Sequence, residues 1–507
     1  MKDYLIAYDF GTGGIKASLY RADGTSVCFS FEEYPTFYPH AGWHEQKPDD
    51  WWNAIRVSTN RLLKESGVDP DNIEALAISG HSLVVVPVDK DGRLLRETIP
   101  IWSDTRSDKE AEEFLGSYGR DKWYMKTGNG FTPSMYSVFK LMWYRKHEPG
   151  MFDRIGCVLG TKDYINFMLT GQRATDHSYA SGHGFYDLKA KAYDFKMLGE
   201  MGLPREIFPD IFPSTEVIGT LTPKAAAEIG LPESVKVCCG GVDNSCMALG
   251  ARGIADGRAY TSLGSSSWIA VTSHEPILDA RIVPFVFAHV VPDMYASATS
   301  IFSAGSTLQW VRDELCKDLM SDGNPYAKMD GLAAGSPVGA NKLLLNPSFA
   351  GGAGTDTTAN VRGAFIGLDL HHTRADVIRS AMEGIAFALR IALDALKKMT
   401  SLQDEMLFVG GGSKSGFWMQ IFADIYGMNI LRTNIGQDAG SLGAAAIAAV
   451  GCGMWKDFSR IDEIHQLVHN NAPIPENRLA YEKLYPVYKK ATEYLSDIGD
   501  LMYDLDI

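Results

Sequence analysis

Several features that mark secreted, metal-binding or membrane proteins are missing from this sequence. The seven cysteines include no CxxC pair and indicate reduced thiols of a cytosolic protein. None of the twelve histidines stands in an HExxH motif or a zinc spacing, which argues against a metal site built by the protein alone. The longest small and apolar run, 439–455, is interrupted by four glycines and is too short for a membrane span, so it predicts a tightly packed interior helix.

Positive charge is also scarce. Lysine and arginine number 48 against 62 acidic residues, a net charge of −14, so no nucleic-acid partner is expected. No charged and apolar leader precedes the first predicted strand at residue 4, so we expect no signal peptide, no membrane partner and a cytoplasmic location. A length of 507 residues exceeds what one core supports and predicts two domains of roughly 200–250 residues.

The most informative stretch lies near the start of the chain. Residues 5–8 form a buried-strand run that ends on Asp9, and a turn with three glycines follows at 11–14. Residues 15–20 then alternate apolar and polar, which predicts a second strand, and 26–31 predicts a third. The pattern is strand, glycine turn, strand, with a carboxylate at the bend.

This context excludes the two common glycine-loop interpretations. A Walker loop needs Gly-Lys-Ser/Thr at the start of a helix, and a dinucleotide fingerprint needs a third glycine where Lys16 stands. What remains is a turn whose backbone N–H groups and Thr12 hydroxyl surround phosphate oxygens, with Asp9 placed to hold a hydrated Mg²⁺. An ordinary glycine-rich hairpin fits this stretch alone equally well.

Two further clusters indicate a polar substrate. His81 stands in a bend between the strand runs 73–78 and 83–88, where either a structural or a binding histidine fits. Trp102 offers a flat face for sugar C–H groups, and Asp104 offers a partner for hydroxyls. The alternative for Asp104 is an ion pair with Arg106.

The second part of the chain repeats the opening theme. The run 235–242 is a buried strand broken by two glycines, and Asp243 follows it, either as a helix N-cap worth about 1 kcal/mol or as a general base at a strand end. A second strand, turn and strand cover 259–271, and a strand feeds a glycine loop and a helix at 407–425. The repeated hairpin predicts a duplicated architecture with a boundary near 250–255.

Taken together, the motifs make the chain resemble the FGGY family of carbohydrate kinases nearly end to end. The motifs that carry the resemblance are Asp9-Phe-Gly-Thr12, Gly42-Trp-His-Glu-Gln46 with Trp51-Trp52, Asp163-Tyr164 with Leu169-Thr-Gly171, Gly240-Gly-Val-Asp243, Thr261-Ser-Leu-Gly264, Gly363-x-Phe365-x-Gly367-Leu368 followed by Asp376–Glu383, and Gly410-Gly-Gly-Ser413. The resemblance implies an α/β, two-domain, actin-like ATPase (ribonuclease H-like) fold, with domains at 1–252 and 253–507. ATP with Mg²⁺ and a sugar then meet in the cleft between the domains.

The resemblance also assigns roles to single positions. Asp243 matches the catalytic base and a metal-side carboxylate, and Asp9 matches the aspartate that holds Mg²⁺ through water. The phosphate loops correspond to Gly11, Thr12, Gly13, Thr261, Gly264 and Ser265, and the adenosine loop to Gly411, Gly412 and Ser413. The sugar side is predicted to be His81, Trp102, Asp104 and Asn244.

Within the family the xylulose kinases are nearest, because His81 stands where they carry Met-His-Gly, although this chain has Gly80-His81-Ser82. We therefore expect a ketopentose such as xylulose. The alternatives are another sugar or polyol, namely ribulose, erythritol, fuculose, glycerol or a signalling sugar, and an actin-like nucleotide-driven binding protein. The oligomeric state stays open, a homodimer included.

Overall fold

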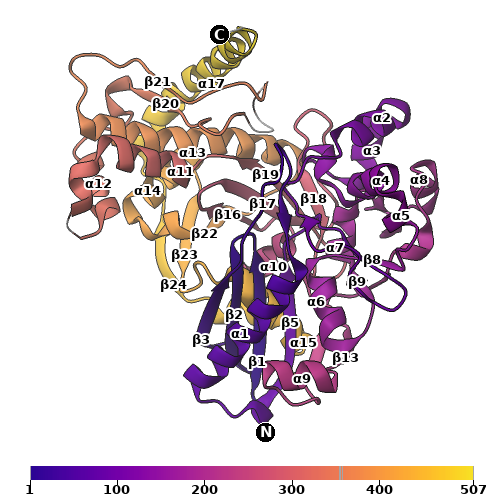
Figure 1. The fold of residues 1–507 in the computed structure, drawn as a ribbon. Coiled ribbons are helices and arrows are strands. Elements are labelled where there is room, and N and C mark those ends of the chain that lie inside the picture. The colour runs from indigo at the N-terminus through magenta and orange to yellow at the C-terminus, as the bar shows by residue number, and fades with distance from the viewer. Residues whose placement is uncertain (1, 322, 353–355, 357, 506–507) are drawn as a thin grey trace.

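The computed structural model describes residues 2–321, 323–352, 356 and 358–505, and Figure 1 shows two halves, each built on a mixed β-sheet with helices around it. The first sheet has seven strands in the order β13-β14-β5-β1-β2-β3, with β15 also paired to β5. Their bounds are β1 Tyr4–Gly11, β2 Gly14–Arg21, β3 Ser26–Glu33, β5 Ile73–Gly80, β13 Val217–Thr220, β14 Lys236–Cys238 and β15 Gly241–Val242.

The second sheet also has seven strands, in the order β18-β19-β17-β16-β22-β23-β24. Their bounds are β16 Ala259–Leu263, β17 Ser267–Ser273, β18 Phe285–Ala288, β19 Tyr295–Ile301, β22 Glu405–Val409, β23 Asn429–Thr433 and β24 Leu467–Asn471. In both sheets a hairpin strand pairs antiparallel with its neighbour and parallel with a later strand, β1 with β5 and β16 with β22. The predicted repetition of the hairpin is confirmed.

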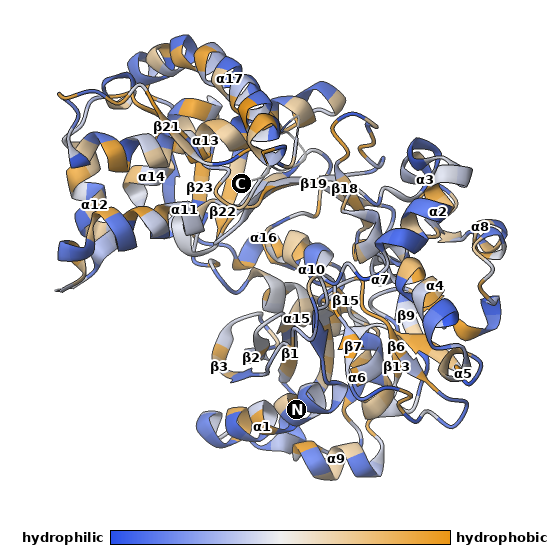
Figure 2. Ribbon diagram, turned by 45° about the horizontal axis from the view of Figure 1, so that its top comes forward, coloured by the Kyte–Doolittle hydropathy of each residue, from blue (hydrophilic) through white to orange (hydrophobic). Residues whose placement is uncertain are grey.

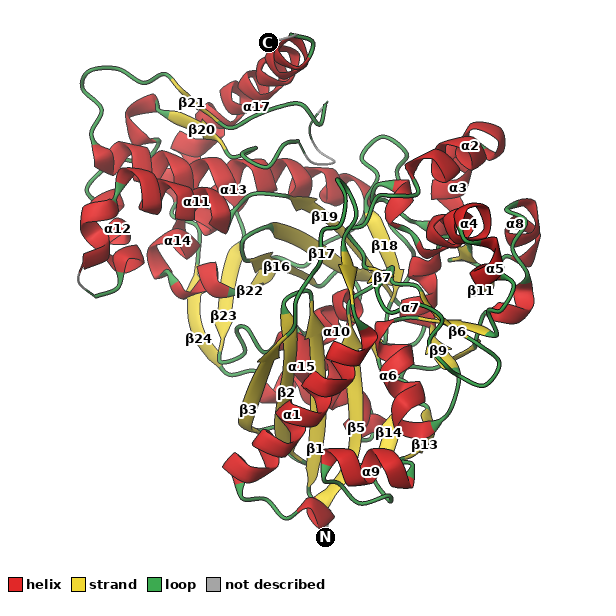
Figure 3. Cartoon of the chain, viewed as in Figure 1, coloured by secondary structure: helices red, strands yellow, loops and turns green. Residues whose placement is uncertain are grey.

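Helices surround the strands in Figure 3. Those of the first half are α1 Pro48–Ser66, α2 Asp108–Tyr118, α3 Arg120–Thr127, α4 Ser137–His147, α5 Pro149–Phe152, α6 Thr161–Thr170, α7 His177–Ala180, α8 Phe195–Glu200, α9 Pro223–Ile229 and α10 Asp243–Gly250. Those of the second half are α11 Gly305–Trp310, α12 Pro325–Ala334, α13 Arg374–Met399, α14 Gly416–Tyr426, α15 Ala439–Gly451, α16 Arg460–Ile464 and α17 Pro475–Tyr503.

Within the described residues, five two-stranded sheets complete the fold. They are β4 Glu45–Gln46 with β7 Ile99–Pro100, β6 Val86–Val88 with β8 Cys157–Leu159, β9 Ala174–Asp176 with β12 Asp210–Phe212, β10 Tyr186–Asp187 with β11 Ala192–Tyr193, and β20 Leu344–Asn346 with β21 Ala364–Ile366.

The first sheet is covered on both faces. Helix α1 begins with Pro48 at its first position and two acidic residues in its first turn, as favourable helix starts do, and it buries Trp51 and Ile55 against one face. Helix α15, from the last quarter of the chain, buries its leucine, isoleucine and alanines against the other face. The prediction of a tightly packed helix in 439–455 is confirmed, and this helix joins the second half of the chain to the first sheet.

Small residues let α15 approach α10 closely. A Cβ added at Gly443 would lie 2.0 Å from the backbone oxygen of Cys246, so only glycine fits at this crossing. Figure 1 shows the two helices side by side beneath the second sheet.

Apolar residues concentrate on strands such as β22 and β23 in Figure 2, and the second sheet packs there against α13 and α14. In the part of the chain that the structure describes, no helix is both long and apolar enough to cross a bilayer.

The order of predicted strands was right, but their ends differ. The strand that begins at Ile73 continues to Gly80, and the run expected at 83–88 shortens to β6, because Leu83 adopts a left-handed backbone with φ of 63°.

Candidate active site

Three strand ends of the first sheet lie in register and bring polar groups together. Asp9 on β1 stands opposite Ser79 on β5, and Ser79 stands opposite Gly241 on β15. Asp243 begins α10 one residue after β15 ends, so it emerges beside the same edge. Residues that are more than 230 positions apart therefore form one cluster at the carboxyl ends of parallel strands, where ligand sites of α/β sheets collect.

Asp9 is partly exposed and held on two sides. The Ser79 hydroxyl donates to its Oδ1 at 2.7 Å, and a Cβ added at Gly440 would lie 2.6 Å from its Oδ2, so the first turn of α15 lies directly against the carboxylate. Burial raises the pKa of Asp9, and the bond from Ser79 and the charge of Lys16 oppose that rise.

Lys16 was not predicted as a site residue, yet it stands opposite Asp9 across the first hairpin. Its ammonium pairs with Asp438, the residue before α15. This ion pair links the first hairpin to the second half of the chain. Its signal in the sequence was that Lys16 is the single charged residue of the run 15–20, which was predicted as the second strand.

Asp243 is the first residue of α10, so it is not the N-cap that the sequence offered as one alternative. The backbone N–H of Asn244 donates to its Oδ1 at 2.8 Å and the Asn244 amide does so at 3.0 Å. Burial raises the pKa of Asp243 to about 7, the bonds from Asn244 lower it, and the charge of Asp9 raises it. A carboxylate with this pKa is matched to proton transfer near neutral pH.

The donor set suits a divalent cation carried by a nucleotide. Asp9 and Asp243 are both partly exposed and close enough for the charge of Asp9 to raise the pKa of Asp243. Among the described residues no group of three or more histidine, cysteine and acidic side chains forms a ligand set. Two carboxylates without a full cage fit Mg²⁺, which keeps several waters and takes its other ligands from phosphates.

The turn of the first hairpin is held by side chains. The Tyr34 hydroxyl donates to the Gly11 oxygen at 2.5 Å, and the Gln46 amide donates to the Thr12 oxygen at 2.7 Å. A Cβ added at Gly13 would meet nothing within 4 Å, so the space beside this glycine is open. The turn is thus held by side chains at Gly11 and Thr12 and open at Gly13, as a phosphate loop requires.

Trp102 lies against this turn. Its indole N–H donates to the Thr12 hydroxyl at 2.8 Å, and 36% of its surface is exposed. A predicted sugar residue and a predicted phosphate residue are therefore in direct contact, and the exposed part of the indole is free to receive a ligand.

His81 is buried between Trp51 and Thr161. The Trp51 ring meets it edge-on at 5.7 Å, and its Nδ1 lies 3.5 Å from the Thr161 hydroxyl. Burial lowers the pKa of His81 to about 3, with a smaller contribution from Lys140, so the ring is neutral. Its Nε2 has no hydrogen-bond partner within the described chain. A buried orphan nitrogen costs about 1–3 kcal/mol, which a substrate hydroxyl would recover.

In the structure Asp104 forms the ion pair with Arg106 that the sequence offered as its alternative role. Asp104 is fully buried, and its carboxylate accepts bonds from the Arg106 guanidinium at 2.8 and 2.9 Å and from the His44 N–H at 2.7 Å. The same arginine binds Glu45 and stacks on Trp43. In this state Asp104 fixes the loop that carries Trp102 and does not face a ligand.

Lys140 on α4 is a functional candidate that sequence reasoning missed. It is fully buried, and its ammonium donates to the backbone oxygens of Leu83 at 2.9 Å and Ile101 at 2.6 Å. Burial lowers its pKa to about 7. Leu83 follows His81 by two residues and Ile101 precedes Trp102, so one side chain ties together both predicted sugar segments.

The second hairpin is held differently. The backbone N–H groups of Ala304 and Ser306 donate to the Ser265 oxygen at 2.9 and 3.1 Å, and Gly305 donates to the Gly264 oxygen at 2.9 Å. The start of α11 therefore braces this turn. Thr261 departs from the prediction, because it is fully buried within β16 and its hydroxyl faces the Met406 sulfur at 3.0 Å.

The predicted adenosine loop lies next to that hairpin because β16 and β22 are parallel neighbours. Gly411 is exposed, and a Cβ there would meet only the Gln437 amide at 3.8 Å. Gly412 packs against Leu263. Ser413 is buried and donates to the Gly410 oxygen at 2.8 Å, so it shapes the loop instead of facing its open side.

The motif at 376–383 lies outside this cluster. Glu383 is buried and accepts bonds from the Tyr481 hydroxyl and the Arg379 guanidinium, each at 2.7 Å. Asp376 accepts bonds from Ser336 at 2.7 Å and Asn341 at 2.9 Å. The motif therefore fixes α13 against α17 and its neighbours.

Known proteins resemble the whole chain. The model of the FGGY family of carbohydrate kinases, N-terminal domain, matches residues 4–250, and that of the C-terminal domain matches 259–452. A xylulose kinase of Staphylococcus epidermidis is 30% identical over 497 residues, which cover 96% of each chain. The crystal structure of a xylulose kinase from Rhodospirillum rubrum aligns with a TM-score of 0.90 at 29% identity over 98% of this chain and 100% of that one. The crystal structure of a gluconate kinase from Lactobacillus acidophilus aligns at 0.89 with 26% identity over 97% and 98%.

Proposed function

The chain belongs to the FGGY family of carbohydrate kinases, and from that premise we propose that it transfers the terminal phosphoryl group of ATP to a hydroxyl of a ketopentose, with xylulose as the first candidate. It has the two-domain, actin-like fold of the family and is a sugar kinase. The observation that carries the mechanism is the cluster of Asp9, Asp243 and Asn244 at adjoining strand ends. The domain boundary at 252/253 stays a prediction.

Asp243 is the general base of this proposal. Both donors of Asn244 bind its Oδ1, which orients the carboxylate and leaves Oδ2 to take the proton of the attacking hydroxyl. A pKa of about 7 lets the group accept that proton and release it again near neutral pH. Phosphoryl transfer requires little other covalent chemistry from the protein. The positioning of the reactants and the stabilisation of their charge dominate the rate.

The nucleotide lies between the two hairpins in this proposal. Backbone N–H groups of the turn at 11–13 and of Ser265 bind phosphate oxygens, and the open face of Gly411 receives the adenosine. The Gly264 N–H donates to the Ser266 oxygen at 3.1 Å and shapes the second turn. Asp9, through water, and Asp243 would hold the Mg²⁺. When bound, this ion neutralises charge on the β- and γ-phosphates.

The sugar lies on the first half. A hydroxyl of the substrate pairs with the orphan Nε2 of His81, and the exposed face of Trp102 covers the carbon chain. Glycerol has a shorter carbon chain and fewer hydroxyls than a ketopentose to offer these two groups, so it should be a poor substrate. A site built to bind a hydroxyl discriminates strongly against a ligand that lacks it, because its own polar groups are left unpaired.

The test is a substrate series scored by ADP release, with xylulose, ribulose, erythritol, fuculose, gluconate and glycerol under identical conditions. Xylulose should have the highest kcat/KM and glycerol a low one. His81→Ala should lower kcat/KM for the best sugar by roughly tenfold or more, because one buried hydrogen bond is lost.

His183→Ala is the matched control for His81→Ala. His183 is equally buried, burial lowers its pKa to about 3, and its Nδ1 lies 3.0 Å from the Tyr193 hydroxyl on β11. Its loss should reduce stability without changing the order of substrates. If His81→Ala stayed within about twofold of the parent, or if glycerol ranked first, the sugar assignment would be wrong.

A further inference from the structure

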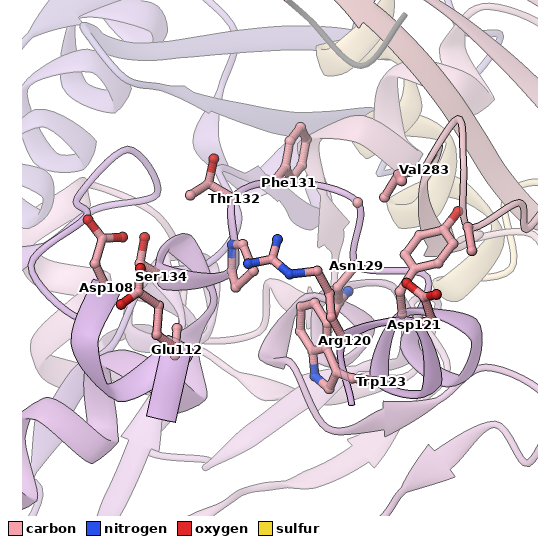
Figure 4. Close-up of a pocket in the computed structure, with 15 residues that line it drawn as sticks. Asp108, Glu112, Arg120, Asp121, Trp123, Asn129, Phe131, Thr132, Ser134 and Val283 are labelled. Atoms are coloured by element: carbon pink, nitrogen blue, oxygen red, sulfur yellow. The ribbon is translucent and has the colours of Figure 1, made fainter. Parts of the chain in front are cut away.

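A cavity of about 380 Å³ lies in the first half and contains none of the predicted site residues. Its size is within the range of small-molecule sites. Helix α2, the start of α3 and the segment 129–134 form most of its wall, and Ala280 and Val283, from the loop before β18, also line it. Figure 4 shows the cavity with Val283 on this side. Segments from both halves of the chain thus meet around it.

Two buried polar atoms of the lining lack partners. Asn129 is 2% exposed and Ser134 is 1% exposed, and neither the Asn129 Oδ1 nor the Ser134 Oγ has a hydrogen-bond partner in the described part of the chain. The orientation of the Asn129 amide is fixed, because its Nδ2 donates to the Ser181 oxygen at 2.9 Å. The Oδ1 is therefore an acceptor that needs a donor, and each such atom costs about 1–3 kcal/mol while it stays unpaired.

The charged side chains of the cavity determine which class of ligand can donate a hydrogen bond to the Asn129 Oδ1. One cation, Arg120, lies between Asn129 and Ser134 in Figure 4, and three acids, Asp108, Glu112 and Asp121, line the rim. None of these four side chains forms an ion pair with another described residue. The rim carries a net negative charge, which disfavours phosphate and carboxylate ligands.

Apolar surface is present as well. Trp123 and Phe131 stand along the wall, and the Phe131 ring stacks on Phe285 with 4.4 Å between centroids. A ligand with hydroxyls that donate to Asn129 and the acids, accept from Arg120 and present C–H groups to aromatic rings satisfies all of these groups. We propose that this cavity binds a small neutral polyhydroxylated molecule, a sugar or polyol, at a site separate from the one that holds the reacting sugar.

The test uses xylitol as the probe, without nucleotide, on the full chain. Crystals soaked in xylitol should hold one molecule between Arg120 and Asn129. Calorimetric titration should show this binding event lost in Ala280→Trp, which fills the cavity from an exposed rim position, and weakened roughly tenfold in Arg120→Ala, where one charged hydrogen bond disappears. Ala190→Trp, at another exposed alanine, should titrate like the parent.

An empty cavity in soaked crystals, or an unchanged titration of Ala280→Trp, would overturn the site. Tighter binding of inorganic phosphate than of xylitol in this cavity would overturn its assignment to neutral ligands. Because the titration needs no ATP and no turnover, a failure of the proposed kinase reaction would leave this result standing, and the reverse also holds.

Discussion

The two halves of the molecule present equivalent hairpins on equivalent strands, but they differ in charge. The hairpin of β1 and β2 carries Asp9 and Lys16, whereas the strands β16 and β17 contain no charged residue. The groups that hold the two turns in place also differ. Side chains of Tyr34 and Gln46 hold the first turn, and backbone N–H groups at the start of α11 hold the second.

This difference indicates a division of work on a duplicated scaffold. The first half supplies titratable groups, Asp9, His81 and Asp243, at the ends of neighbouring strands. The second half supplies glycines and backbone amides at the ends of β16 and β22. In the proposed function these backbone groups bind phosphate and adenosine. They do not titrate, so proton transfer would belong to the first half alone.

The largest effect should come from removing the base of the first half. Asp243→Asn should lower kcat by roughly 10²–10⁴-fold while the affinity for ATP, measured by calorimetry, is kept. In the parent, kcat/KM should rise with pH up to about 7 as Asp243 loses its proton, and then level off. A near-normal kcat in the variant would remove Asp243 from this role.

The thermal stability of the same variant tests whether its lower kcat comes from misfolding. The pKa of Asp243 is about 7 in the folded chain against 3.8 unfolded, so ionisation favours the unfolded state. This penalty is absent below pH 3.8 and complete above about pH 7. Asp243→Asn should therefore raise Tm relative to the parent at pH 8 and lose this gain as the pH falls toward 4. A difference in Tm between variant and parent that stayed constant from pH 8 to pH 4 would contradict the ionisation of Asp243 as its cause.

The second largest effect contrasts the two hairpins directly. Asp9→Asn should lower Mg²⁺-dependent turnover on the order of 10²-fold, because several kcal/mol of charge stabilisation depend on the ion. Ser265→Ala, in the turn of the second hairpin, should cost less than about tenfold, because the backbone of that turn does the binding. Mg²⁺ titrations of both variants measure the contrast. A titration of the Asp9 variant that matched the parent would make Asp9 structural.

Much of this arrangement was predictable from patterns along the chain. Alternation and glycines predicted both hairpins, and Asp9 and Asp243 stood at the predicted strand ends. The sequence did not predict the direction in which single side chains point. All of β16 is buried, so its sequence does not indicate that the Thr261 hydroxyl faces Met406. Asp104 and its arginine were seen as a pair, but only the fold shows that Glu45 and His44 complete their bonds.

Lys140 was missed for a related reason. Its partners are backbone oxygens, and a sequence does not show which carbonyls turn toward a buried ammonium. Helix α15 illustrates the same limit at larger scale. Its small-residue composition predicted an interior position, but not that a helix after residue 438 would cover the sheet that contains residues 4–33.

A smaller effect tests how the first half positions its sugar segments. Lys140→Met removes the bonds to Leu83 and Ile101 and frees a strained left-handed backbone beside His81, a conformation that costs about 1–3 kcal/mol. We expect KM for the sugar to rise roughly tenfold while KM for ATP stays unchanged. Lys146→Met, at an exposed lysine of α4 whose ammonium pairs with Glu110 and Glu113, is the control and should change neither. Equal changes in both KM values would indicate a general loss of stability.

The smallest expected effect is a change of shape that brings the two unlike hairpins together. They belong to different halves, and the halves are joined at the close crossing of α10 and α15 and at the Lys16–Asp438 ion pair. Contacts such as the stacking of Phe131 on Phe285 also bridge them, so only a limited rotation is available. The radius of gyration from X-ray scattering should therefore decrease slightly when sugar and a non-hydrolysable ATP analogue are both present, and less with either alone. Asp243→Asn should close like the parent, since binding and not proton transfer drives the motion. An unchanged radius in the ternary complex would mean that the hairpins already face each other at the reacting distance.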